Sequence, residues 1–107
     1  MFARILDFEV KMEKKDEFVK VMKNQVLPIL RKQNGFREFL PFFPEKMKDR
    51  IFTISLWTTK QDADRYEREF YPKIHDILKP FLTTPVGVNF YNLENTLCEH
   101  FVEALAA

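Results

Sequence analysis

One stretch of the chain, residues 66–75, combines tyrosine and histidine at helical spacing. Tyr71 precedes His75 by four residues, so the two side chains share one side of a helix. Histidine changes its charge near neutral pH, which suits His75 either to move a proton or to bind haem iron as an axial ligand. The alternative is that His75 has no chemical role and lies at the border of the buried stripe of its helix. Tyr66 carries a hydroxyl that needs a partner in the core and that, in a pocket, would hydrogen-bond a phenol or help take its proton.

Three further side chains are candidates for binding. Trp57, the sole tryptophan, ends a predicted strand, where it either packs over the start of a helix or forms a pocket wall that stacks on a planar substrate. Asn89, on the last predicted strand, would orient a carbonyl group or dioxygen if it faces a pocket. Arg4 lies among apolar neighbours, where an unpaired charge is costly. It either pairs with an acid such as Asp7 or Glu38 at a subunit seam, or binds an anionic group in a pocket.

Other kinds of catalytic machinery are missing from the sequence. The single cysteine, Cys98, has no histidine or acid motif beside it, and His100 is expected on the surface. One cysteine also excludes a disulfide framework and a site built from several thiolates. The sequence has no glycine-rich phosphate loop, serine nucleophile motif or metal-ligand spacing. We therefore expect neither a metal nor a bound cofactor.

The composition describes one globular domain over residues 1–107. Of these residues 46% are apolar and 31% are charged, and the net charge is +1. Without a surplus of cations, we expect no binding to nucleic acid or to a membrane surface. No run approaches the roughly 18 apolar residues that span a bilayer, and residues 1–10 lack the apolar stretch of a signal peptide. The expected location is cytoplasmic.

Alternating apolar residues predict four strands, at 2–11, 36–43, 50–57 and 86–93. Pro41 cannot donate to a ladder, so the second strand belongs at a sheet edge or at a bulge. The polar loop 44–49 joins the second and third strands as a hairpin.

Helical spacing predicts two long helices between the strands. In the first, Pro28 should kink or divide the helix, and Asn34-Gly35 should end it. The second should begin at a capping box made by Thr58 and Gln61 and end near Pro80, with a kink at Pro72. A short tail helix is predicted at 94–107.

The predicted order β-α-β-β-α-β is that of the α+β ferredoxin-like fold, in which both helices cover one face of a four-stranded antiparallel sheet. Both faces of this sheet are apolar in sequence: Phe2, Leu6 and Phe8 oppose Ala3 and Ile5. Phe36, Leu40 and Phe42 are likewise expected to oppose Phe39 and Phe43. Because two helices cannot cover both faces, we expect a homodimer formed through the uncovered face.

The segments LPILRKQNGF (27–36), ISLWTTKQDADRYE (54–67) and PKIHDILKPFL (72–82) resemble the antibiotic-biosynthesis-monooxygenase-like family. The resemblance extends from the first strand to residue 93. It implies a dimeric α/β barrel with a pocket in each subunit between sheet and helices. Members oxidise aromatic polyketides or quinols with oxygen and no cofactor, and a second branch degrades haem. That branch has a tryptophan at the position of Tyr66, a histidine near the position of His75 and an asparagine on the first strand. This chain has a tyrosine in place of the tryptophan, and its first strand contains no asparagine.

The resemblance and the residues together predict a cofactor-independent monooxygenase that acts on a small aromatic phenol or quinol. Tyr66 and His75 are expected to handle the proton. The expected substrate-binding residues are Trp57, Asn89, Tyr71 and Arg4. The alternative is a dimer that binds a small molecule or haem without chemistry, and it predicts a pocket that is small or filled by phenylalanine.

Overall fold

The computed structural model describes residues 1–46 and 50–93. The predicted tail helix at 94–107, with Cys98 and His100, lies outside the described residues. No helix among those described is both long and apolar enough to cross a membrane.

The framework is a four-stranded sheet with the order β2-β3-β1-β4. Every neighbouring pair is antiparallel, so the chain has the predicted ferredoxin-like topology. β2 is an edge strand, as Pro41 requires. The strands are β1 (Phe2–Phe8), β2 (Phe36–Phe42), β3 (Ile51–Trp57) and β4 (Gly87–Asn92).

The first helical segment is interrupted where the sequence places a proline. Pro28 has no N–H to donate to the preceding turn, and just before it the helix widens into a π-helical turn, in which the Leu27 N–H donates to the Met22 carbonyl. Gly35 then ends the segment with a positive φ of 80°. The parts are η1 (Met12–Lys14), α1 (Lys15–Val21), η2 (Met22–Val26) and α2 (Leu27–Arg31).

The second helical segment begins one residue later than predicted. Thr59, and not Thr58, is the N-cap, and its hydroxyl accepts from the Asp62 backbone N–H at 3.2 Å. The segment also breaks completely at Phe70, because Pro72 starts a new helix and does not merely kink the old one. The parts are α3 (Lys60–Glu69), α4 (Tyr71–Leu78) and η3 (Lys79–Phe81).

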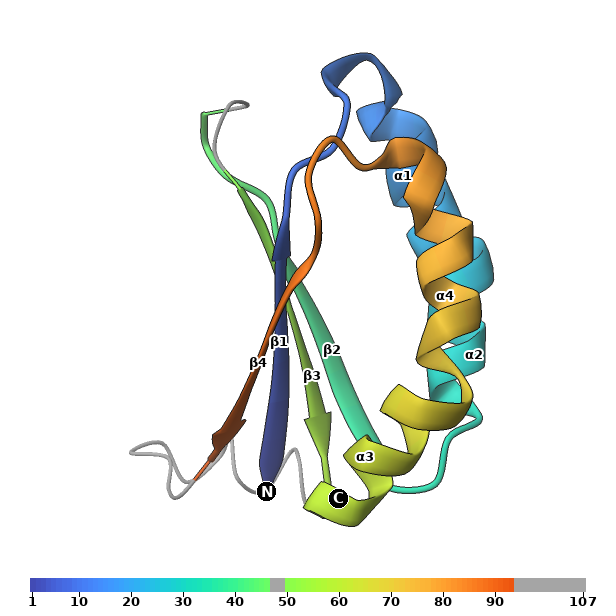
Figure 1. Ribbon diagram of the computed structural model, residues 1–107, viewed down its shortest axis with the longest axis vertical. Coiled ribbons are helices and arrows are strands. Elements are labelled where there is room, and N and C mark those ends of the chain that lie inside the picture. Colours follow the sequence, from blue (N-terminus) through green and yellow to red (C-terminus); the bar gives the residue numbers. More distant parts are fainter. Residues whose placement is uncertain (47–49, 94–107) are drawn as a thin grey trace.

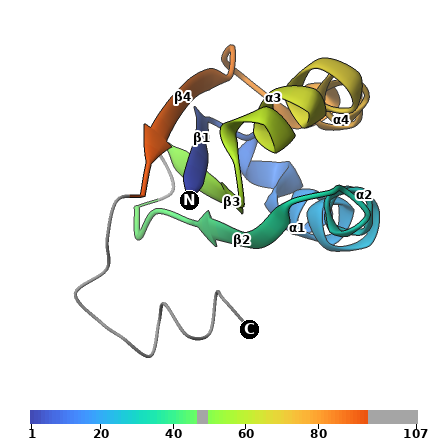
Figure 2. The ribbon, with the colours of Figure 1, turned by 90° about the horizontal axis from the view of Figure 1, so that it is seen from below.

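All the helices within residues 1–46 and 50–93 lie on one face of the sheet (Figure 1). Seen along the strands, α1 and α2 cover the β2 side, and α3 and α4 cover the side nearer β4 (Figure 2). The core fills the space between the two layers. Its buried apolar members are Phe2, Leu6, Phe8, Phe18, Met22, Val26, Leu30, Ile51, Trp57, Ala63, Tyr66, Tyr71, Ile74, Leu78 and Phe81.

The other face of the sheet, which we call the open face, carries apolar side chains that none of the described helices covers. Phe42, Phe52 and Tyr91 are exposed to 52%, 49% and 57%. One detail corrects the sequence prediction: a bulge between Phe36 and Glu38 shifts the register of β2. Phe36 therefore faces the helices together with Phe39, and it is Leu40 and Phe42 that face outward.

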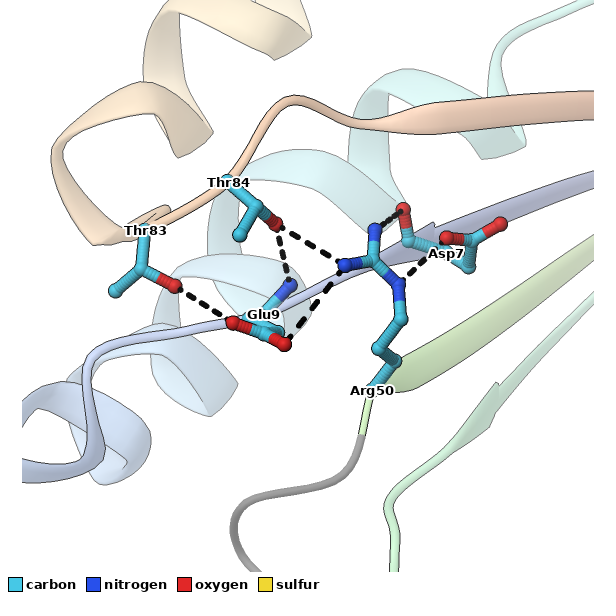
Figure 3. A network of polar contacts seen from close by, with 5 residues as sticks. All are labelled: Asp7, Glu9, Arg50, Thr83 and Thr84. Carbon is cyan, nitrogen blue, oxygen red and sulfur yellow. Dashed lines mark hydrogen bonds and ion pairs between the residues drawn. The ribbon is translucent and has the colours of Figure 1, made fainter.

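A polar cluster ties the sheet together at the end where β3 starts (Figure 3). The Arg50 guanidinium donates to the Asp7 carboxylate at 2.7 Å and to the Asp7 carbonyl at 3.1 Å. It also reaches the Thr84 hydroxyl at 3.4 Å and lies 3.8 Å from Glu9. The Thr83 hydroxyl donates to the Glu9 carboxylate at 3.3 Å. The cluster therefore links β1, β3 and the segment that leads into β4.

Candidate active site

Arg4 is the centre of the candidate site. It points from the middle of β1 toward α3, is only 2% exposed, and its Nε donates to the carboxylate of Glu67. The guanidinium carbon lies 4.1 Å from the centre of the Tyr71 ring and 5.3 Å from that of Tyr66. The cation is thus held by one acid and two aromatic faces.

The partner of Arg4 corrects the prediction from sequence. Asp7 lies on the opposite face of β1 and binds Arg50, while Glu38 lies on the open face of β2, opposite Leu56. Arg4 is therefore paired inside the subunit, under the helices, and not at a seam on the open face.

Apart from the contact between Arg4 and Tyr71 themselves, two polar atoms at this site are buried without a hydrogen-bond partner: Nη2 of Arg4 and the hydroxyl oxygen of Tyr71. Buried polar groups in proteins are nearly always hydrogen-bonded, and the exceptions often have a functional reason. Because one is a cationic donor and the other a phenol, both suit a ligand that carries an oxygen atom. The arrangement can therefore donate hydrogen bonds to an oxygen atom placed between the two side chains.

Both tyrosines stay protonated at neutral pH. Burial raises the pKa of Tyr66 far above its ordinary value of 10.0, and the Arg4 cation offsets only part of this effect. Burial raises the pKa of Tyr71 as well, again against a smaller opposing effect of Arg4. The two hydroxyls are therefore hydrogen-bond donors at neutral pH, and the side chains of Glu67 and His75 lie next to this cluster.

Trp57 packs behind the tyrosines as part of a row of rings. It has no exposed surface, and its ring centre lies 5.0 Å from Tyr66 and 5.7 Å from Phe36. Its indole N–H donates to the Ser55 hydroxyl at 2.9 Å. Of the two roles considered for Trp57, this environment fits packing rather than a pocket wall. The indole ring holds the Tyr66 ring in place.

His75 and Asn89 end on different sides of the sheet. His75 is half-buried, and its ring lies edge-on to Tyr71 with the centres 6.0 Å apart, as the helical spacing predicts. Asn89 is exposed and pairs with Ile5, so it lies on the open face. The fold therefore brings together Arg4, Trp57, Tyr66, Tyr71 and His75, and leaves Asn89 away from them.

Two hollows adjoin this cluster. A cavity of about 20 Å³, lined by Arg4, Ser55, Tyr66 and Tyr71 among others, lies between sheet and helices. An apolar pocket of about 200 Å³ lies beside it, between the first helical segment and β2. The two share the lining residues Met22, Phe39 and Thr53.

The sequence analysis missed Glu67 and these three lining residues. A signal for Glu67 was present, because it follows the buried Ala63 by four residues and so lies beside the buried stripe of α3. For Met22, Phe39 and Thr53 there was none, because core residues that line a cavity have the same pattern as those that fill one. Within the described ranges, no group of three or more His, Cys, Asp or Glu side chains is placed to hold a metal ion.

Solved structures with the same fold include several oxygenases. SnoaB, described as a cofactor-independent oxygenase from Streptomyces nogalater, is 18% identical with a TM-score of 0.75, over 90% of this chain and 95% of SnoaB. A monooxygenase from the gene ActVA-Orf6 of Streptomyces coelicolor, bound to nanaomycin D, is 15% identical with a TM-score of 0.73, over 91% and 90%. Rv0793 from Mycobacterium tuberculosis is 14% identical with a TM-score of 0.70, over 91% and 98%.

At these identities the solved structures establish the fold alone, and no curated protein matches the chain at a significant level. The sequence itself carries the further evidence. The family model for antibiotic biosynthesis monooxygenase matches residues 1–71, which include Arg4, Trp57, Tyr66, Glu67 and Tyr71. The chain belongs to the antibiotic biosynthesis monooxygenase family.

Proposed function

We propose that this protein is a monooxygenase that oxidises a small phenol or quinol without a bound cofactor, at the cluster around Arg4. Membership of the family supports oxygenase chemistry, and SnoaB, which shares the fold, is described as cofactor-independent. The observation that carries the proposal is the pair of buried, unpartnered polar atoms on Arg4 and Tyr71. A phenolate oxygen would satisfy both.

The residues suggest a division of labour. Arg4 stabilises the phenolate that forms when the substrate loses its proton, and the Tyr71 hydroxyl donates a second hydrogen bond to it. The electron-rich anion then reduces dioxygen. One oxygen atom enters the ring, and the other leaves as water with two hydrogens from the substrate. His75, next to Tyr71, is the proposed proton acceptor, while Tyr66 and Trp57 keep the site dry and rigid.

The proposal includes a homodimer formed through the open face. The exposed aromatic residues Phe42, Phe52 and Tyr91 support it, because large apolar side chains on a sheet face are stable when another surface covers them. In this arrangement the candidate site lies inside each subunit, on the far side of the sheet from the contact.

Oxidation of 1,5-dihydroxynaphthalene to its hydroxyquinone under oxygen-18 gas tests the activity, because this reaction consumes one dioxygen and releases one water. We expect one labelled oxygen per product molecule. Arg4→Met should lower the turnover about a hundredfold, the cost typical of losing one donor to a developing oxyanion. Arg50→Met, which removes the arginine that pairs with Asp7 on the open face, is the matched control and should stay near wild type. Label incorporation no faster than without protein would refute the proposal.

A second candidate function is binding without chemistry, favoured by the small size of the cavity beside Arg4, about 20 Å³. It predicts that naphthols bind without any consumption of oxygen. Haem binding through His75 is the third outcome: added haem would then give a Soret band that His75→Ala removes.

A further inference from the structure

The apolar pocket of about 200 Å³ has the properties of a ligand site rather than of a packing defect. Apart from the Lys23 side chain at its rim and the buried Thr53, its lining is apolar and includes Phe18, Phe39 and Phe43. Several aromatic side chains around one hollow suit a flat apolar ligand.

The size of the pocket limits the ligand. An apolar cavity of about 150 Å³ is known to bind benzene, and pockets for drug-sized ligands begin at about 300 Å³. A pocket of about 200 Å³ therefore has room for one or two fused rings, and three rings exceed it.

The position of the pocket connects it to the candidate site. Met22, Phe39 and Thr53 line both this pocket and the cavity beside Arg4, so these three side chains form the partition between the two spaces. Met22 begins the π-helical turn that Pro28 imposes. Its side chain is unbranched and flexible, so it can change rotamer at low cost.

We propose that the apolar pocket binds the hydrocarbon part of a one- or two-ring phenol, whose hydroxyl passes the Met22–Phe39–Thr53 partition to reach Arg4 and Tyr71. This inference rests on the proposed function for its reaction, but it adds a binding site and a size limit for the substrate. The pocket supplies apolar contact, and the small cavity supplies the charge and the hydrogen bonds. Each hollow thus takes the part of the ligand that matches its chemistry.

The test fills the pocket from its rim and measures binding separately from turnover. Val19 lines the pocket and is 38% exposed, so Val19→Trp adds bulk there without disturbing the core. Lys20→Trp adds the same side chain at the next position, which is exposed and outside the pocket lining. The dissociation constant of 1-naphthol is measured by calorimetry under argon. It should agree within twofold between wild type and Lys20→Trp, and it should be at least tenfold higher for Val19→Trp.

A second pair of variants tests the partition. Met22→Ala joins the two hollows, so the three-ring 2-anthrol should bind it at least tenfold more tightly than it binds wild type. Met22→Leu keeps most of the bulk and should bind 2-anthrol no more tightly than wild type does, which separates a change of space from a loss of folding.

The outcomes keep the two proposals apart. If wild type does not bind 1-naphthol, or if both tryptophan variants weaken binding equally, the pocket assignment is wrong even where oxygenation is observed. A change in sedimentation of Val19→Trp with unchanged naphthol affinity would show that the pocket is a contact between chains, which also overturns it. If the variants behave as expected and no labelled oxygen enters 1,5-dihydroxynaphthalene, the pocket assignment stands and the proposed oxygenase activity does not.

Discussion

The two faces of the sheet bury apolar residues in different ways. On the helix-covered face, the β1 side chains Phe2, Leu6 and Phe8 are exposed by no more than 7%, and the charged Arg4 among them by only 2%. On the open face, neighbouring strands present Phe42, Phe52 and Tyr91 with about half of each side chain exposed.

This difference shows where each kind of function belongs. A buried cation is tolerated only where a carboxylate and aromatic faces surround it, and the helices supply both through Glu67, Tyr66 and Tyr71. On the open face the charged groups, Asp7 with Arg50 and also Glu38, keep contact with water, and Phe42, Phe52 and Tyr91 offer an apolar surface for association. Chemistry is therefore expected under the helices and assembly on the open face.

The largest expected effect comes from a charge on the open face. In Phe52→Glu, a twofold-symmetric contact would bring two carboxylates into an apolar surface, and we expect the dissociation constant to rise about a thousandfold, or roughly 4 kcal/mol. Phe70→Glu makes the same change at an exposed phenylalanine between α3 and α4 and should not affect assembly. Sedimentation of all three proteins checks this. A wild type that is already a monomer at micromolar concentration would remove the basis for the comparison.

On the helix-covered face, removing the acid that pairs with Arg4 should be nearly as costly. Glu67→Ala leaves a buried guanidinium without its carboxylate, and we expect a loss of about 3 kcal/mol in the free energy of unfolding. We take the low end of the usual range because the Glu67 side chain is 32% exposed. Glu67→Gln keeps an acceptor and should lose clearly less. Urea unfolding measures both; a loss under about 0.5 kcal/mol for Glu67→Ala would mean that Arg4 finds solvent instead.

The same face should make stability sensitive to alkaline pH. Since burial raises the pKa of Tyr66 above 10.0, the folded protein keeps this proton at a pH where the unfolded chain has lost it. Its contribution is fully present below pH 10 and declines as the pH rises further, by about 1.4 kcal/mol per pH unit. Unfolding of wild type and Tyr66→Phe at pH 9 and 11 isolates this contribution. Equal losses in the two proteins would contradict it.

The smallest expected effect concerns the polar cluster that links β1, β3 and the segment before β4. Arg50 is 37% exposed, so its ion pair with Asp7 is screened by water, and Arg50→Ala should cost about 1 kcal/mol. Arg68, which is 70% exposed and 3.8 Å from Glu69, is the control and should show no measurable loss. Thermal unfolding compares the two. Equal shifts would mean that the cluster adds nothing beyond an ordinary surface pair.

Much of the fold could be predicted because its signals are local. Alternation marks the four strands, helical spacing marks the helices, and Pro28 and Pro72 act on their own turns. The errors lie where neighbours decide. The bulge after Phe36 depends on pairing with β3, and the choice of Thr59 over Thr58 as the cap depends on where β3 ends, at Trp57.

The candidate site divides in the same way. Spacing alone places Tyr66, Tyr71 and His75 along one helical segment, and the cost of burying a charge requires a partner for Arg4. The identity of that partner was decided by tertiary structure, because residues 4 and 67 are brought together only when α3 packs on β1. Register likewise set Asn89 opposite Ile5 and so on the open face.

Away from the bulge in β2, the sequence by itself determined which side chains share a face, since the strand repeat of two residues is a property of the backbone. Which face the helices cover, and how much space remains beneath them, was decided only by packing. The cavity of about 20 Å³ and the pocket of about 200 Å³ are what remains when the volume of the side chains is subtracted from the space between sheet and helices. The residues that set these two volumes lie far apart in the chain. No local pattern records such a difference.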